Sequence, residues 1–114
     1  MTLEVLSEII NAKRVSGGND AGVEVNEAFA SDLMSDVLTL DNRNPLLITG
    51  LSNMQTIRTA EMADINVIVL ARGKKASSEM IALAQELDIF ILETNFSVFK
   101  TCGILFQNSI IPLY

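Results

Sequence analysis

The sequence predicts an α/β fold, in which one domain holds a mainly parallel sheet flanked by helices. Three short apolar runs carry this prediction, and they are centred near Leu47, Ile68 and Ile91, at intervals of 21 and 23 residues. After each run come polar residues able to cap a helix, and then apolar residues at helical spacing. Strand and helix alternating at this interval are typical of successive right-handed βαβ crossovers.

Length and composition agree with this fold class. The chain has 114 residues, enough for one domain with a core, so residues 1–114 are expected to form a single domain. Hydrophobic residues make up 49% of the chain, with no Trp, one Tyr and five Phe. Aliphatic side chains therefore dominate, as they do where helices pack on a parallel sheet.

The first thirty residues carry weaker signals. Thr2 can cap a helix over residues 3–10, whose apolar face includes Leu6, Ile9 and Ile10. A short strand is predicted at residues 13–15, and the glycine-containing stretch 16–20 predicts a turn. Residues 22–29 largely alternate apolar and polar, which predicts a half-buried strand.

A polar cluster marks the next helix, predicted at residues 31–38 with Ser31 or Asp32 as its N-cap. Its expected buried face consists of Leu33, Met34, Val37 and Leu38. Asp32, Ser35 and Asp36 lie on the polar side, and the two acids share a face because they are four residues apart. Two carboxylates at this spacing could hold a divalent cation. Alternatively, one is an N-cap and the other a solvated acid, because the sequence shows no third oxygen ligand for a cation.

The central unit follows a turn predicted at residues 41–45. Residues 46–49 form the first buried strand, and Ser52 with Gln55 matches a capping box for the helix after it, which ends near Asp64. Its apolar positions are Met54, Ile57, Ala60 and Ala63.

The two later units repeat this order. A strand at residues 65–71 leads through the loop 72–75 to a helix capped by Ser77 or Ser78, with apolar positions at Met80, Ile81, Ala84 and Leu87. A strand at residues 89–92 leads through the capping stretch 94–97 to the last helix, whose expected apolar face is Val98, Phe99, Cys102, Leu105 and Phe106. Cys102 is accordingly expected to be a small core residue.

Charge and residue usage exclude several function classes. The net charge of −6 disfavours nucleic acids and anionic membranes as partners. The sequence shows no long apolar segment and no signal peptide, so a cytoplasmic protein is expected. With no histidine and one cysteine, a Cys/His zinc site, a histidine-based triad and an internal disulfide are excluded. No catalytic residue, metal or cofactor is predicted, and the chain is not expected to be an enzyme.

Ligands of open parallel sheets bind outside the carboxyl ends of the strands, where three loops are predicted to meet. Arg72, Lys74 and Lys75 concentrate positive charge there in an acidic protein, which indicates a site for a small anion. Its candidate residues are Gly50, Ser52, Asn53, Arg72, Gly73, Lys74, Thr94 and Asn95. Alternatively, the glycines only allow turns and the lysines are only solvated, because neither a G-x-G-x-x-G nor a P-loop fingerprint is present.

Several segments together resemble the DRTGG domain family over nearly the whole chain. They are the Ser-Asp-Leu-Met-Ser-Asp run at 31–36 with its continuation to residue 38, and the segments 47–50, 68–73, 82–87 and 99–106. A contiguous Asp-Arg-Thr-Gly-Gly is absent, and Leu51-Ser52-Asn53 stands where relatives often have a histidine. The resemblance implies a fold like the N-terminal domain of HPr kinase/phosphorylase, and a regulatory and oligomerising role.

The sequence thus favours a non-catalytic regulatory or assembly domain, which forms a homodimer, contacts a partner protein and senses a small anionic ligand at the strand ends. Two alternatives stay open. Because stand-alone members of the similar family occur alongside iron-hydrogenase components, the chain could be an accessory protein of such a system. It could also be a carboxylate- and Mg²⁺-dependent enzyme built on Asp32 and Asp36.

Overall fold

A six-stranded sheet organises the computed structural model, which describes residues 1–40 and 44–114. The strands are β1 (Ala12–Ser16), β2 (Glu27–Ala30), β3 (Leu46–Thr49), β4 (Val67–Leu70), β5 (Phe90–Thr94) and β6 (Ile111–Pro112). The helices are α1 (Leu3–Ile9), α2 (Met34–Val37), α3 (Met54–Met62), α4 (Ser78–Glu86) and α5 (Val98–Gln107). The predicted turn at 41–45 lies partly outside the described residues.

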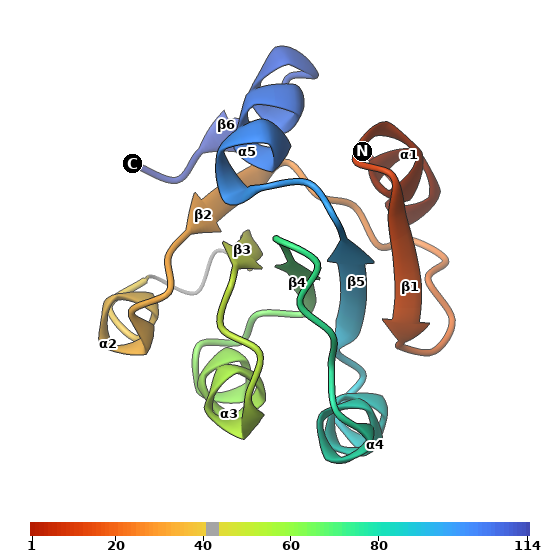
Figure 1. The fold of residues 1–114 in the computed structure, drawn as a ribbon, viewed down its shortest axis with the longest axis vertical. Coiled ribbons are helices and arrows are strands. Elements are labelled where there is room, and N and C mark those ends of the chain that lie inside the picture. The colour runs from red at the N-terminus through yellow and green to blue at the C-terminus, as the bar shows by residue number, and fades with distance from the viewer. Residues whose placement is uncertain (41–43) are drawn as a thin grey trace.

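The strand order is β1-β5-β4-β3-β2-β6, and among these six described strands only β1 runs antiparallel to its neighbour. Helices α2, α3 and α4 lie on one side of the sheet, and α1 and α5 lie on the other (Figure 1). The predicted α/β class with a mainly parallel sheet is therefore confirmed.

The core consists of two apolar layers, one on each face of the sheet. Leu47, Ile68 and Ile91 pack in the layer under α2, α3 and α4, while Ile48, Val69 and Leu92 pack in the layer under α1 and α5. Because both faces are covered, every residue of β3 and β4 is buried, which explains the unbroken apolar runs in the sequence.

The predicted cap Thr2 is confirmed, and the structure narrows two others to Ser77 rather than Ser78 and to Ser97 within the stretch 94–97. The side chains of Thr2, Ser77 and Ser97 accept hydrogen bonds from backbone N–H groups in the first turns of α1, α4 and α5. The predicted capping box of α3 is wrong, because its N-cap is Asn53, whose Oδ1 accepts from the N–H of Thr56. The Ser52 hydroxyl instead donates to the carbonyl oxygen of Lys75, 2.5 Å away, on the next loop.

The predicted helix at 31–38 is shorter than expected. Helix α2 begins after Leu33, which makes no side-chain cap, so neither Ser31 nor Asp32 is the N-cap. Met34 and Val37 are buried as predicted, but Leu33 and Leu38 are exposed. One turn of helix buries only one narrow face, and these two leucines lie outside it.

The predicted strand at 22–29 is also corrected. Only residues 27–30 form a strand there, paired with β3 and β6, while Glu24 makes an isolated bridge with Thr2. The N–H of Val25 donates to the carbonyl oxygen of Met1, so this stretch is held by the N-terminus rather than by a neighbouring strand.

The last helix buries less of its apolar face than predicted. Leu105 is buried, but Phe99 and Phe106 are 89% and 69% exposed. Cys102 is half-buried rather than a core residue. The buried residues Thr101 and Leu105 lie on one stripe of α5, and Phe99 and Phe106 lie on a different stripe of the same helix.

Candidate functional site

The loops after β3, β4 and β5 meet at the carboxyl edge of the sheet and are tied together by backbone hydrogen bonds. The N–H of Ala71 donates to the carbonyl of Thr49, the N–H of Gly73 donates to the carbonyl of Thr94, and the N–H of Arg72 donates to the carbonyl of Phe96. Because the loop after β4 is bonded to both neighbouring strand ends, the three loops form one continuous surface.

Arg72 and Gly50 are in direct contact at this edge. Arg72 has a left-handed backbone with φ of 63°. A β-carbon built on Gly50 would lie 2.9 Å from Nε and 3.1 Å from Nη2 of Arg72, so the arginine occupies the space that a side chain at residue 50 would need. Among residues 1–40 and 44–114, no hydrogen bond or ion pair engages the Arg72 guanidinium. Its donors therefore face solvent at the edge of the sheet.

Asp32 joins the same site from the end of β2. Its Oδ1 accepts hydrogen bonds from the Thr49 hydroxyl at 2.9 Å and from the Gly50 N–H at 2.6 Å. The Thr49 oxygen in turn accepts from the N–H of Leu51. Gly50 thus donates its N–H to a carboxylate, while the Arg72 guanidinium fills the space that a side chain on Gly50 would need.

The other members of the predicted polar cluster do not join this arrangement. Ser35 and Asp36 are exposed on α2, and no hydrogen bond in the described part of the chain links either side chain to Asp32. Nor do the described residues contain a group of three or more Asp, Glu, Cys or His side chains placed to hold a metal ion.

Gly73 and Asn95 lie side by side next to Arg72. Gly73 has a φ of 71°, and a β-carbon there would come within 3.3 Å of the Asn95 Oδ1. Thr94 is buried, since its hydroxyl donates to the carbonyl of Ile10 and accepts from the N–H of Phe96. The buried Thr94 side chain therefore holds the surrounding backbone in place. The Asn95 side chain is exposed and can face a ligand at this edge.

The remaining predicted residues also divide into those that hold the loops in place and those that are exposed at this edge. Ser52 and Asn53 are used by the loop and helix contacts described above, and Lys74 is exposed. Lys75 is paired with Glu93, at 3.6 Å between Nζ and Oε1. The structure brings Gly50, Arg72, Gly73 and Asn95 together, with Asp32 behind Gly50.

Glu93 is a residue that sequence reasoning did not single out. It is only 8% exposed, and its Oε2 accepts from the N–H of Ala76 at 2.7 Å. An acid inside the apolar run of β5 is the sequence signal that could have identified it, because buried carboxylates need partners. Its contacts hold the loop that carries Lys74 and Lys75.

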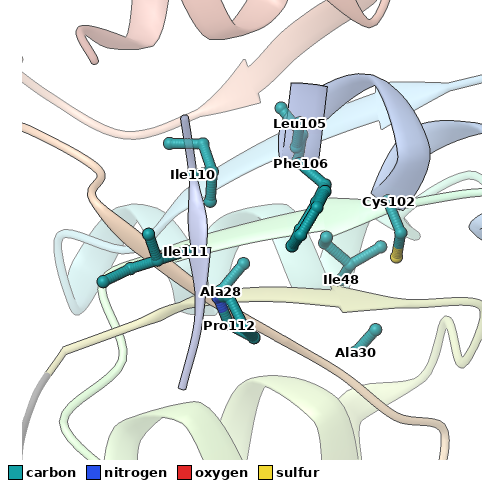
Figure 2. A pocket seen from close by; sticks show the side chains of 9 residues that line it. All are labelled: Ala28, Ala30, Ile48, Cys102, Leu105, Phe106, Ile110, Ile111 and Pro112. Atoms are coloured by element: carbon teal, nitrogen blue, oxygen red, sulfur yellow. The ribbon is translucent and has the colours of Figure 1, made fainter. Parts of the chain in front are cut away.

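A second concave feature lies under α5, on the side of the sheet that α1 and α5 cover. It is an apolar pocket of about 180 Å³, lined by Ala28, Ala30, Ile48, Cys102, Leu105, Phe106, Ile110, Ile111 and Pro112. Figure 2 shows Phe106 and Cys102 reaching from α5 toward the strands that form the floor. Burial raises the pKa of the Cys102 thiol, which therefore stays protonated at neutral pH.

No helix in the described part of the chain is both long and apolar enough to cross a membrane.

Neither a family model nor a curated protein matches this sequence. Among solved structures, the chain is similar to the CBS and DRTGG domains of the regulatory region of Clostridium perfringens pyrophosphatase, a structure complexed with an activator, diadenosine tetraphosphate. The TM-score is 0.79 at 15% sequence identity, over 96% of this chain and 47% of that chain. This chain thus spans less than half the length of that relative, and the likeness shows a shared CBS/DRTGG-like fold.

Proposed function

We propose that this chain is a non-catalytic regulatory domain of the DRTGG type, spanning residues 1–114, that binds a small anionic ligand at the carboxyl edge of its sheet. The observation that carries the proposal is the Arg72 guanidinium held over Gly50 with no partner in the described part of the chain. An arginine in this position can form two parallel hydrogen bonds to a phosphate group.

Charge and fold support the same site. The chain as a whole carries a net charge of −6, so the exposed cations Arg72 and Lys74 form a local exception that favours an anion. The Asn95 amide beside Gly73 adds a polar group at the same edge. The pyrophosphatase region with a similar fold binds a nucleotide activator, so we choose phosphate-bearing nucleotides as the ligand class to test.

The regulatory proposal includes association with other chains. Large apolar side chains are exposed at several places on the surface, among them Leu33, Met62, Phe99 and Tyr114. Exposed apolar groups of this size favour protein contacts. We propose that the chain dimerises and passes the ligand signal to a partner protein.

Two alternatives gain no support from the geometry. A magnesium enzyme built on Asp32 and Asp36 would need their carboxylates to converge, yet Asp32 is engaged with Thr49 and Gly50. A role beside iron-hydrogenase components rests on family context alone, and no contact in the described part of this chain favours it.

Isothermal titration of the full chain with diadenosine tetraphosphate, ATP and inorganic phosphate tests the ligand proposal. Arg72→Ala is expected to weaken the binding of the best of these ligands about tenfold or more, because a charge-assisted hydrogen bond is lost. Arg58→Ala is the matched control, since Arg58 is an exposed arginine on α3 that pairs with Glu61. It should leave the affinity unchanged. Absence of heat and of thermal stabilisation with all three ligands would overturn the ligand proposal.

A further inference from the structure

Two oppositely charged side chains lie beside Gly50 without pairing with each other. The Gly50 N–H donates to Oδ1 of Asp32 at 2.6 Å, and the Arg72 guanidinium fills the space of a β-carbon on Gly50. Since that β-carbon position is 2.9 Å from Nε of Arg72, at most about 8 Å separates this nitrogen from Oδ1 of Asp32. No ion pair joins the two residues in the described part of the chain. One small molecule could therefore contact both.

Asp32 keeps one carboxylate oxygen available for such a molecule. Its Oδ1 already accepts two hydrogen bonds, from the Thr49 hydroxyl and from the Gly50 N–H. Among residues 1–40 and 44–114, no donor engages Oδ2, and Asp32 is exposed. The two bonds to Oδ1 orient the carboxyl group, so Oδ2 is a fixed acceptor with room for further donors.

The Asp32 charge narrows the kind of anion that the site favours. A phosphate group bound to Arg72 would lie near the negative charge of Asp32, and like charges repel. A bare anion leaves this repulsion uncompensated. A ligand that also brings hydroxyl groups would instead donate charge-assisted hydrogen bonds to the carboxylate.

A ribose phosphate has both kinds of group at a suitable separation. One sugar ring lies between the 5′-phosphate of a nucleotide and its 2′ and 3′ hydroxyls. In other nucleotide sites of α/β proteins, an acidic side chain at the end of a strand accepts hydrogen bonds from ribose hydroxyls. Asp32, which follows β2 (Glu27–Ala30), has the chemistry and the position for this contact.

We infer that the site binds a ribose 5′-phosphate unit, with the phosphate on Arg72 and a 2′ or 3′ hydroxyl on Oδ2 of Asp32. Asp32 is then a specificity-determining residue, because it favours a nucleotide over inorganic phosphate. This inference rests on the anion site proposed above, and it adds the class of ligand and a second binding residue.

Isothermal titration of the full chain with AMP and with 2′,3′-dideoxy-AMP tests the hydroxyl contact. These ligands differ only in the two ribose hydroxyls, so their phosphate and base are matched. AMP is expected to bind about tenfold more tightly, because the dideoxy compound cannot donate to the charged carboxylate. Equal affinities would overturn the inference without any change to the protein.

Asp32→Asn assigns the contact to this residue. The asparagine Oδ1 can still accept from Thr49 and Gly50, so the melting temperature should stay close to that of the wild type. The charged acceptor is lost, so AMP affinity should fall about tenfold. Affinity for dideoxy-AMP should stay the same or rise up to about twofold, because a negative charge near the phosphate is removed. Asp36→Asn removes the same charge from an exposed position on α2 and should change neither affinity.

The remaining outcomes separate this inference from the proposed function. If Asp32→Asn changes the affinities for AMP and dideoxy-AMP by the same factor, Asp32 only anchors the loop after β3, and the inference fails. Binding of inorganic phosphate without binding of AMP would also overturn it, while the anion site would stand. If no phosphate-bearing compound binds, the anion site fails together with the inference.

Discussion

Arg72 lies against Gly50, with its Nε 2.9 Å from the position that a β-carbon on residue 50 would occupy. The two residues come from loops after neighbouring strands, and their contact places a guanidinium at the carboxyl edge of the sheet. Gly50 has no left-handed backbone, so the position of the Arg72 side chain, and not backbone strain, is what disfavours a larger residue there.

Gly50→Ala should therefore act on ligand binding more than on stability. The added methyl group displaces the Arg72 side chain, which is long and can move, so the free energy of unfolding is expected to fall by about 1 kcal/mol or less. Nucleotide affinity should fall about as far as in Arg72→Ala. Titration calorimetry and urea unfolding measure the two effects. Wild-type nucleotide affinity in the Gly50→Ala variant would contradict the proposed role of Arg72.

Asp32→Ala should destabilise the fold although Asp32 is exposed. Its carboxylate accepts from the Thr49 hydroxyl and the Gly50 N–H, and both donors belong to buried residues that would be left without this acceptor. The expected loss is about 1–3 kcal/mol by urea unfolding. Asp36→Ala is the control, since Asp36 is exposed on α2, and it should change stability by no more than about 0.5 kcal/mol.

Glu93 and Lys75 form an ion pair, but removing the Glu93 side chain should destabilise the fold more than removing the Lys75 side chain. Glu93→Ala removes a buried acceptor of the Ala76 N–H, so a loss of about 2 kcal/mol is expected. Lys75→Ala should cost about 0.5 kcal/mol, because the lysine side chain is 67% exposed and its ion pair is screened by solvent. Chemical unfolding of both variants measures the two losses in the free energy of unfolding. Equal losses would contradict this account.

Alanine substitutions at Gly17 and Gly22 separate the cost of a left-handed backbone from the cost of a steric clash. Both have positive φ, but a β-carbon on Gly17 would lie 2.1 Å from the Phe90 ring, whereas one on Gly22 would meet nothing within 4 Å. Gly22→Ala should cost about 1 kcal/mol from the left-handed backbone alone. Gly17→Ala should cost at least about 2 kcal/mol more, because Phe90 must move out of the core. Similar melting temperatures for the two variants would be the contrary result.

Cys102 should make stability and thiol reactivity depend on pH in the alkaline range. Burial raises the pKa of its thiol above the ordinary value, so the folded state disfavours the thiolate. The contribution of Cys102 to the free energy of unfolding should be constant below the pKa of the unfolded thiol and should fall as the pH rises from that pKa to the higher pKa of the folded thiol. Cys102→Ser should remove this decline. Alkylation by iodoacetamide should be slower in the folded chain than in the unfolded chain at the same pH, since the thiolate is the nucleophile.

The predicted fold class and the confirmed helix caps follow from short stretches of sequence. The runs around Leu47 and Ile68 indicated strands because a strand covered on both faces is apolar throughout. Thr2 was identified as a cap, and the caps of α4 and α5 were narrowed to Ser77 or Ser78 and to residues 94–97, because a capping side chain bonds a backbone N–H three residues later, which is a local contact. Ser52 was misassigned because its hydroxyl bonds Lys75, a residue distant in sequence.

What the sequence by itself determined is the alternation of strands and helices and the carboxyl edge at which their loops collect. Burial and capping impose patterns within a few residues, so these features are visible without the fold. The tertiary structure alone decided that Arg72 covers Gly50, that Asp32 ties β2 to β3, and that Phe99 points outward. Each of these depends on which strands and loops become neighbours, and that follows from packing the whole chain rather than from any one segment.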